Sequence, residues 1–207
     1  MNKKITAALI INIFVVIATT AICTSYWFYT NNPLVESGFD SFKFFTTDSN
    51  ILAAVSSLVL IPFEIQILRG RRKTLPHAAV VLKLVGMTSV MLTFTTVMTV
   101  LLPQYDPAFL LLGTATYTHV LGPLSALVTF LFLETDSKIK LPETLFALIP
   151  TALYGSVYMY NVLISHDWLD FYTFNKGGYW YISVIVIFAV TYLISFVTRL
   201  IHNKLCK

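Results

Sequence analysis

Six long apolar runs occupy most of this chain of 207 residues. They cover roughly residues 5–28, 50–68, 77–102, 109–133, 143–165 and 179–201. Each is long enough, or nearly so, to cross a hydrocarbon core of about 30 Å at a helical rise of about 1.5 Å per residue. Within such a core a helix satisfies its own backbone hydrogen bonds. The sequence therefore predicts an all-α polytopic membrane protein, with six transmembrane helices in a single domain over residues 1–207.

The composition agrees with a membrane location. Charged residues make up 12% of the chain and hydrophobic residues 57%, whereas soluble domains carry about 25% charged residues. The net charge is +4, but the basic residues are divided among short loops and form no long groove for a nucleic acid. We therefore predict the bilayer as a partner, with the positive charge facing anionic lipid.

The basic residues also predict the orientation of the chain. Lysines and arginines flank both chain ends and fill the turns after the second and fourth runs: Lys3, Lys4, Arg69, Arg71, Arg72, Lys73, Lys138, Lys140, Arg199, Lys204 and Lys207. The loops on the other side hold only Lys43 and Lys176. Because Lys and Arg concentrate on the cytoplasmic side, we predict a multi-pass protein of the cell membrane with both termini in the cytoplasm.

No motif in the sequence indicates a metal or another cofactor. The chain contains no CxxC, HExxH or histidine-rich cluster. Cys23 and Cys206 are expected about a membrane's thickness apart, which is too far for a disulfide within one chain. We therefore predict no cofactor and two ordinary thiols.

Two ionisable side chains lie inside the predicted spans near the cytoplasmic side. Glu64 is about 7 Å, and Lys83 about 10 Å, from the turn that joins the second and third spans, at about 1.5 Å per residue. A short hairpin makes these two helices antiparallel neighbours. The side chains therefore either pair with each other, or Lys83 extends to the lipid headgroups. A structural role is the favoured interpretation for both.

His119 lies deeper in a predicted span than the other histidines, in the middle to outer part of the fourth. A neutral imidazole can accept a proton near pH 7 and serve as a general base. Pro123, four residues further on, would leave a backbone carbonyl free for His119 to bond. The alternative is an interhelical hydrogen bond without catalysis, because buried polar residues in bundles often only hold helices together.

A polar segment opens the second span. Thr46 and Asn50 share one helical face because they are four residues apart, and Thr47, Asp48 and Ser49 cover most other directions. One interpretation is a helix N-cap, since these residue types are preferred there and a negative charge suits a helix N-terminus. The other is that the segment belongs to a functional site.

Two further polar stripes are expected to face the interior, because polar stripes facing lipid would be costly. Hydroxyl and amide side chains recur at helical spacing in the fifth and third spans: Thr151, Tyr154, Tyr158 and Asn161 in one, and Thr88, Thr95 and Thr99 in the other. The small residues of the third span fit close helix packing. The tyrosines either line a cavity for an amphipathic ligand or belong to the aromatic belt of the outer interface.

These motifs resemble those of a known family. The segment from Phe42 to Asn50, Phe-Lys-Phe-Phe-Thr-Thr-Asp-Ser-Asn, resembles the opening of the second span in the androgen-induced and androgen-dependent TFPI-regulating membrane proteins. It is still more similar to their bacterial six-span relatives, in which Phe-Thr-x-x-Ser-Asn is typical. The residues from His119 to Pro123 resemble the His-then-Pro motif of a later span, and those from Asp167 to Tyr179 resemble the last outer loop. With the six-span layout, the resemblance covers most of the chain.

The resemblance implies an enzymatic activity. The animal members of the family are integral-membrane threonine hydrolases, which cleave the ester between a fatty acid and a hydroxy fatty acid. By resemblance, Thr46 is the nucleophile and His119 the base that takes its proton. Asn50 would donate a hydrogen bond to the tetrahedral intermediate, and Asp48 would either orient the imidazole or cap the helix. A lipid or fatty-acyl ester would bind in a dry slot between the helices.

The depths of the two proposed catalytic residues differ. Along straight helices, Thr46 is about 33 Å and His119 about 21 Å from the cytoplasmic ends of their spans. Contact between them therefore needs a tilted helix, a kink at Pro62 or Pro123, or a re-entrant stretch around residues 40–50. The sequence also leaves a non-catalytic lipid-binding or transport protein open, and a structural partner of another membrane protein, although it shows no inverted repeat.

Overall fold

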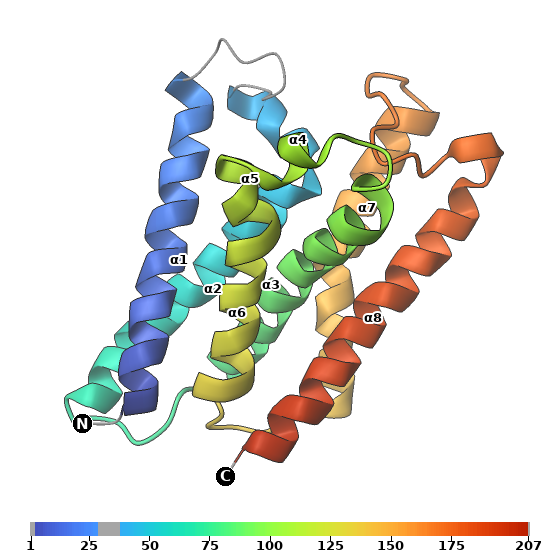
Figure 1. The fold of residues 1–207 in the computed structure, drawn as a ribbon. Coiled ribbons are helices and arrows are strands. Elements are labelled where there is room, and N and C mark those ends of the chain that lie inside the picture. The colour runs from blue at the N-terminus through green and yellow to red at the C-terminus, as the bar shows by residue number, and fades with distance from the viewer. Residues whose placement is uncertain (1–2, 29–37, 207) are drawn as a thin grey trace.

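The computed structural model describes residues 3–28 and 38–206, and these residues form helices and connecting loops without any strand (Figure 1). Six helical segments are long and apolar enough to cross a membrane: Lys3–Phe28, Phe45–Leu68, His77–Leu101, Thr114–Leu133, Leu141–Leu163 and Trp180–Leu205. The prediction of a six-helix polytopic membrane protein is therefore confirmed. The cytoplasmic orientation stays a prediction, and Lys207, which contributes to it, lies outside the described residues.

Three of the six spans each consist of one uninterrupted helix. They are α1 (Lys3–Phe28), α2 (Phe45–Leu68) and α8 (Trp180–Leu205). The 3-10 helix η1 (Gly38–Lys43) precedes α2, and η6 (Lys176–Gly178) precedes α8. The third span is α3 (His77–Thr96), continued by the π-helical turn η2 (Val97–Leu101).

The fourth and fifth spans are composite. The fourth contains α5 (Thr114–Thr116), the π-helical η3 (Tyr117–Leu121), α6 (Gly122–Val128) and the π-helical η4 (Thr129–Leu133). The fifth joins the 3-10 helix η5 (Leu141–Ala147) to α7 (Leu148–Leu163). Single π-helical turns inside longer helices are frequent at functional sites, so the turn that contains His119 is of particular interest.

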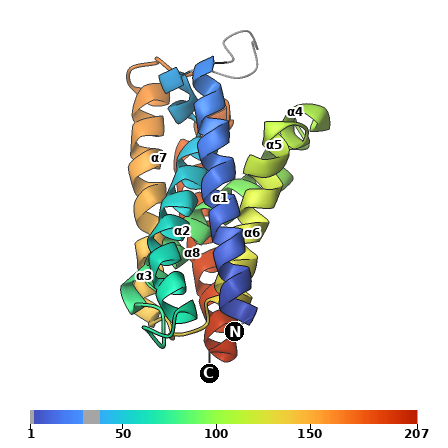
Figure 2. The ribbon, with the colours of Figure 1, turned by 90° about the vertical axis from the view of Figure 1, so that its left-hand side faces the viewer.

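The fourth span begins later than its apolar run. A separate short helix, α4 (Pro107–Leu111), comes first, and Asp106 caps it by accepting a hydrogen bond from the Ala108 amide at 2.8 Å. Gly113 then adopts a φ of 65°, a conformation that favours glycine, and the chain turns into α5. The expected start at residue 109 is therefore replaced by Thr114. In Figure 2, α4 and α5 lean away from the rest of the bundle.

Helix α2 ends in a well-defined turn, which begins the hairpin to α3. Gly70 has a φ of 69°, its amide donates to the Ile67 carbonyl, and the Arg71 amide donates to the Gln66 carbonyl at 2.9 Å. This pattern is the Schellman motif that ends many helices. The two helices then pack closely, because a Cβ added at Gly86 would lie 2.6 Å from the Ser56 hydroxyl and 3.1 Å from the Ala53 Cα.

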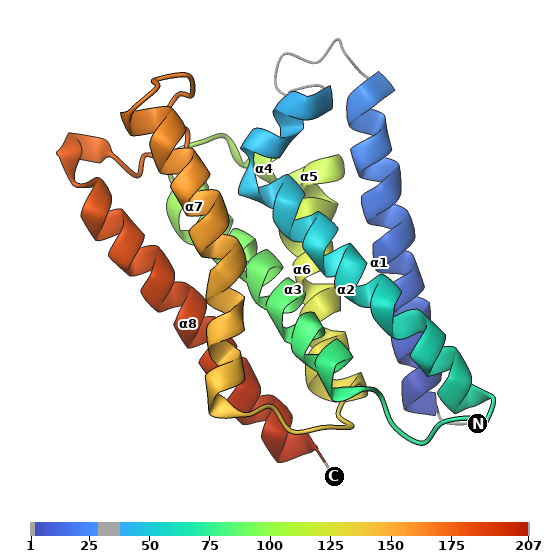
Figure 3. The ribbon, with the colours of Figure 1, turned by 180° about the vertical axis from the view of Figure 1, so that it is seen from behind.

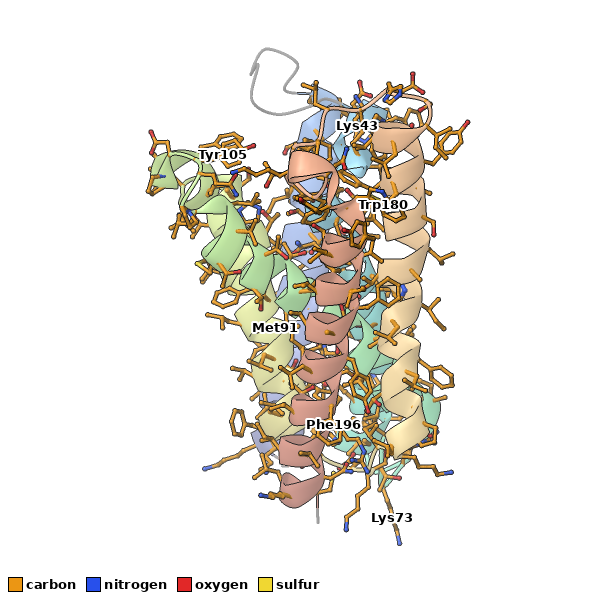
Figure 4. All side chains as sticks on the ribbon, turned by 90° about the vertical axis from the view of Figure 1, so that its right-hand side faces the viewer. Lys43, Lys73, Met91, Tyr105, Trp180 and Phe196 are labelled. Atoms are coloured by element: carbon orange, nitrogen blue, oxygen red, sulfur yellow. The ribbon has the colours of Figure 1, made fainter. Side chains whose placement is uncertain are left out.

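The bundle has two distinct ends. The start of α1 and the end of α8 lie together with the α2–α3 hairpin, at the end where Lys73 points outward (Figures 1 and 4). We call this the terminal end. Lys43, Tyr105 and Trp180 lie toward the opposite end (Figure 4). Between the two ends α3 is central, since it contacts α2, α6, α7 and α8.

Each half of the bundle has its own apolar core. Near the terminal end, Leu60, Leu84 and Phe130 belong to a core built from α2, α3 and the fourth span. Toward the opposite end, Leu101 and Tyr158 belong to a second core, which includes Tyr172 from the loop before α8. The second core is rich in aromatic rings, and it surrounds the cavity described below.

Candidate functional site

A cavity of about 60 Å³ lies in the half of the bundle toward the opposite end. Its walls come from the start of α2, the end of the third span, α7, α8 and the loop before α8. Apolar side chains make up most of the lining, and hydroxyl groups supply its polar part: Thr46, Thr93, Thr96, Thr151, Tyr154, Tyr158 and Tyr172. The cavity therefore suits a small polar group that is attached to an apolar body.

Three tyrosines fix the walls of this cavity. The Tyr154 hydroxyl donates to the Lys43 carbonyl at 2.6 Å, which joins α7 to the end of η1, just before α2. The Tyr158 hydroxyl donates to Asp170 at 2.7 Å and accepts from the Tyr172 amide at 3.2 Å. The loop before α8 is thereby held against α7. Of the two alternatives left open for Tyr154 and Tyr158, the structure agrees with the cavity wall.

Tyr172 reaches the first turn of α2 from that loop. Its hydroxyl accepts a hydrogen bond from the Phe45 amide at 3.1 Å and lies beside the side chains of Tyr154 and Thr46. Burial raises the pKa of the Tyr172 hydroxyl to about 12, so the phenol is neutral and can donate a hydrogen bond. The sequence places Tyr172 only within the outer loop, because nothing in its local sequence shows that the loop folds back onto α2.

Thr46 lies in the first turn of α2 and is half-buried on the cavity wall. Helix α2 begins at Phe45, five residues before the predicted start of the second span. Phe44 occupies the N-cap position and makes no side-chain cap hydrogen bond. None of the residues from Thr46 to Asn50 is therefore the N-cap, although Asp48 lies in the first turn of α2, where that interpretation expects a negative charge.

Asn50 connects α2 to the fourth span. Its side-chain Nδ2 donates to the Thr46 carbonyl at 2.8 Å and to the Thr118 carbonyl at 3.0 Å. Gly122 makes room for this contact, because a Cβ there would lie 2.8 Å from the Asn50 Oδ1. Helix α2 is tilted relative to α1 (Figure 3), so the first turns of α2 and the π-helical η3 meet at one level. Both N–H groups of Asn50 are thereby engaged.

His119 lies in η3, next to the residue that Asn50 contacts. Its Nδ1 is 2.6 Å from the Leu110 carbonyl oxygen. A carbonyl only accepts hydrogen bonds, so Nδ1 carries the proton and Nε2 is the basic nitrogen. The expected bond to a carbonyl freed by Pro123 is therefore replaced by a bond to α4. His119 is not among the residues that line the cavity, and no hydrogen bond joins it to Thr46 within the described residues.

Two other predicted site residues lie away from this cavity. Asp48 is half-buried on the wall of a groove between α2 and α7, and its carboxylate makes no hydrogen bond within the described residues. Asn161 donates to the Val157 carbonyl of its own helix at 2.8 Å and does not line the cavity. The structure therefore brings Thr46, Tyr154 and Tyr158 together at the cavity. Asn50 is joined to this group through its hydrogen bond to the Thr46 carbonyl. Asp48 and Asn161 lie apart from it.

The threonines of the third span divide between two roles. Thr93 and Thr96 line the cavity, and the Thr93 hydroxyl is 2.8 Å from that of Ser49. Thr99 is exposed and bonds the Thr95 carbonyl of its own helix, so the stripe from Thr88 to Thr99 is only partly interior.

The ionisable residues Glu64 and Lys83 lie in a separate cluster near the terminal end. Lys83 does not extend to the surface, since its side chain is 1% exposed. It also does not pair directly with Glu64. Its Nζ bonds Asn12 and Ser57 instead, and Asn12 in turn bonds Glu64. The expectation of a simple pair is thus replaced by a larger network, which involves Asn12 and Glu134 as well.

The described residues contain no cluster of metal ligands. No group of three or more His, Cys, Asp or Glu side chains among them could hold a metal ion. Cys23 and Cys206 are both free thiols.

Comparisons with known proteins add no family assignment. A scan against protein-family models gives no match, and searches of curated proteins and of solved structures give none either. The fold thus defines the class of a six-helix polytopic membrane protein. The resemblance to the threonine hydrolase family stays a prediction.

Proposed function

We propose that the protein is an integral-membrane hydrolase of lipid esters, of the type that joins a fatty acid to a hydroxy fatty acid. Thr46 is the proposed nucleophile and His119 the proposed base. The observation that carries the proposal is the position of Thr46 on the wall of a largely apolar cavity, beside a neutral tyrosine hydroxyl. A nucleophile, an apolar surface for an acyl chain and a hydrogen-bond donor are the groups that ester cleavage in a membrane requires.

The proposed reaction proceeds in two stages. The Thr46 hydroxyl attacks the ester carbonyl while its proton passes to Nε2 of His119, and the imidazolium then protonates the departing alkoxide. Water attacks the resulting acyl-threonine with His119 again as the base, which releases the fatty acid and restores the hydroxyl. Tyr172 is positioned to donate a hydrogen bond to the tetrahedral oxyanion. Asn50 acts as a positioning residue, since both of its N–H groups already bond backbone carbonyls.

This mechanism requires His119 and Thr46 to approach each other, because no hydrogen bond joins them within the described residues. The only hydrogen bond of the His119 ring within the described residues runs to α4, through the Leu110 carbonyl. Loss of that hydrogen bond would free the ring to turn toward the cavity. Catalytic hydrogen bonds often form only once substrate is bound. We therefore propose that substrate binding displaces His119 from the Leu110 carbonyl and turns its ring toward Thr46.

The cavity volume limits how the substrate binds. About 60 Å³ accommodates a few water molecules or an ester group, whereas sites for whole ligands measure about 300–1,000 Å³. The acyl chain must therefore extend out of the cavity. Val184, Ile187 and Phe188 of α8 form an apolar wall on one side, which offers a route along that helix toward the lipid.

A non-catalytic lipid-binding or transport protein is the second candidate. One observation favours it: His119 lies outside the cavity that Thr46 lines. In that case the threonine and tyrosine hydroxyls would hold the polar head of a lipid, and no bond would be cleaved.

The test compares turnover of a fluorogenic long-chain ester by purified protein and three variants. Thr46→Ala and His119→Ala should each lower the rate by roughly 100-fold or more, as expected for loss of a nucleophile or a general base. Thr99→Ala is the matched control, because Thr99 is an exposed threonine that bonds only its own helix. Wild-type rates in both folded site variants would overturn the hydrolase. Absent turnover, with Thr46-dependent binding of an ether analogue, would establish the binding protein instead.

A further inference from the structure

A cluster of polar side chains lies deep in the half of the bundle near the terminal end, away from the cavity. Asn12 of α1, Glu64 of α2, Lys83 of α3 and Glu134, which directly follows η4, are each 0% exposed. Ionisable side chains in such surroundings are costly and commonly mark ion or proton sites in membrane proteins. The cluster is independent of the proposed hydrolase site, because it shares no residue with the cavity.

Asn12 is the centre of the cluster. Its Nδ2 donates to Oε1 of Glu64 at 2.9 Å and to Oε1 of Glu134 at 2.8 Å. Its Oδ1 accepts from the Lys83 ammonium at 2.6 Å. A single amide therefore links the two carboxyl groups and the lysine, and all of its hydrogen-bonding groups are used.

Lys83 supplies the only positive charge in direct contact with the cluster within the described residues. Its Nζ donates to the Ser57 hydroxyl at 2.7 Å and lies 3.8 Å from Oε1 of Glu134. One ammonium thus faces two carboxyl groups. With all three groups ionised, the cluster would hold one uncompensated negative charge, which a buried site does not tolerate.

The second oxygen of each carboxyl group can take up the proton that balances the excess negative charge. Oε2 of Glu64 and Oε2 of Glu134 are buried and have no hydrogen-bond partner within the described residues. An ionised carboxylate oxygen without a donor is strongly disfavoured in an apolar interior, whereas a protonated carboxyl is neutral. One proton on either carboxyl group would remove the excess charge.

The elements packed around the cluster bring no other charged group into contact with it in the described part of the chain. Lys3 and Lys4 on α1 are exposed. His202 of α8 uses both ring nitrogens in hydrogen bonds to backbone carbonyls, those of Phe130 and Ser137, and makes no hydrogen bond to the cluster. Asp136 accepts a hydrogen bond from the Leu75 amide. The charge balance therefore depends on Glu64, Lys83 and Glu134 themselves.

We propose that Asn12, Glu64, Lys83 and Glu134 form a site that binds a single exchangeable proton, shared between the two carboxyl groups. A proton fits this site better than a metal ion, because two donors, the Asn12 amide nitrogen and the Lys83 ammonium, already contact the carboxyl oxygens that a cation would need. Glu64 is four residues from the end of α2, about 6 Å along the helix. A proton released from Glu64 therefore has only a short distance to cross to the terminal end.

Infrared difference spectroscopy on the full-length protein in lipid tests this site. As the pH is raised, the wild type should lose one protonated-carboxyl band, equivalent to one proton per chain. Glu64→Gln and Glu134→Gln should each remove that band, since glutamine keeps the shape and has no proton to release. Asp167→Asn, which alters an exposed carboxyl group in the loop before α8, is the control and should leave the band unchanged.

The outcomes separate proton binding from its alternatives. Carboxyl groups that stay ionised at every pH at which the protein is folded would overturn the proposal, as would a band that survives both glutamine variants. A titration displaced by sodium but not by choline would identify a cation site and overturn it too. Should the variants fail to fold, carbon-13 labelling of glutamate in the wild type decides, because the band must shift if a glutamate carries the proton.

Discussion

The two halves of the bundle use polar side chains in different ways. Near the terminal end, two carboxyl groups and a lysine are fully buried and linked through Asn12, in helices packed closely enough that Gly86 has no room for a Cβ. Toward the opposite end, threonine and tyrosine hydroxyls surround a cavity, and Gly155 on its wall has nothing within 4 Å of an added Cβ. In this protein the buried charged side chains lie in the closely packed half. The half that has space for a ligand contains only neutral polar groups around its cavity.

The largest expected effect concerns the buried charges. Lys83→Met removes the only ammonium of the cluster and leaves two carboxyl groups without a counter-charge. We expect the free energy of unfolding to fall by about 3–5 kcal/mol, as for other buried pairs that lose one partner. Unfolding titrations in mixed micelles measure this loss. The double variant Lys83→Met with Glu134→Gln should recover part of it, and a loss below about 1 kcal/mol would contradict the buried network.

A second prediction compares the packing of the two halves directly. Gly86→Ala places a methyl group 2.6 Å from the Ser56 hydroxyl and should cost about 1–3 kcal/mol. Gly155→Ala is the matched change in α7, where nothing lies within 4 Å. It should stabilise the protein by about 0.5–1 kcal/mol, because alanine favours the helix. Thermal unfolding of both variants measures the difference, and equal destabilisation would show that the two halves are packed alike.

A third prediction, with a smaller expected cost than Gly86→Ala, concerns the loop before α8. Tyr172→Phe removes one hydrogen bond to the Phe45 amide and should cost about 0.5–1.5 kcal/mol. The raised pKa of Tyr172, about 12 against 10.0, means that the folded state favours the neutral phenol. Its contribution is complete below about pH 10 and is lost as the pH rises toward about 12.

Stability measured against pH checks this contribution of Tyr172. The wild type should lose more stability than Tyr172→Phe over the interval between about pH 10 and about pH 12. Parallel losses in the two proteins would show that the hydroxyl is not buried in the folded state.

The sequence predicted the six spans because long apolar runs have one stable solution in a bilayer. It did not predict the break at Gly113, since leucines run through Leu110, Leu111 and Leu112 and hydropathy does not change there. It also missed Glu134, which follows the last apolar residue of its run and resembles a loop residue in the sequence. Only the packing of the fourth span against α1 and α3 buries that side chain.

The sequence also predicted only part of the candidate site, because some of its residues act through contacts that are distant in the sequence. The spacing of Tyr154 and Tyr158 identified one wall of the cavity, because helical periodicity is a local property. Tyr172 and Asn12 act through contacts with residues far away in the sequence, and neither has a distinctive local motif. Asp48 and Asn161 matched polar patterns, yet the rotation of their helices directs them away from the cavity.

Covalent trapping of the nucleophile tests the central claim most directly. The purified protein is incubated with a slowly released long-chain activated ester, then digested and analysed by mass spectrometry. We predict one acyl group per chain, located on Thr46, and absent from Thr46→Ala but present in Thr99→Ala. Acylation at any other residue, or none despite binding of the ester in the cavity, would contradict a hydrolase that uses Thr46.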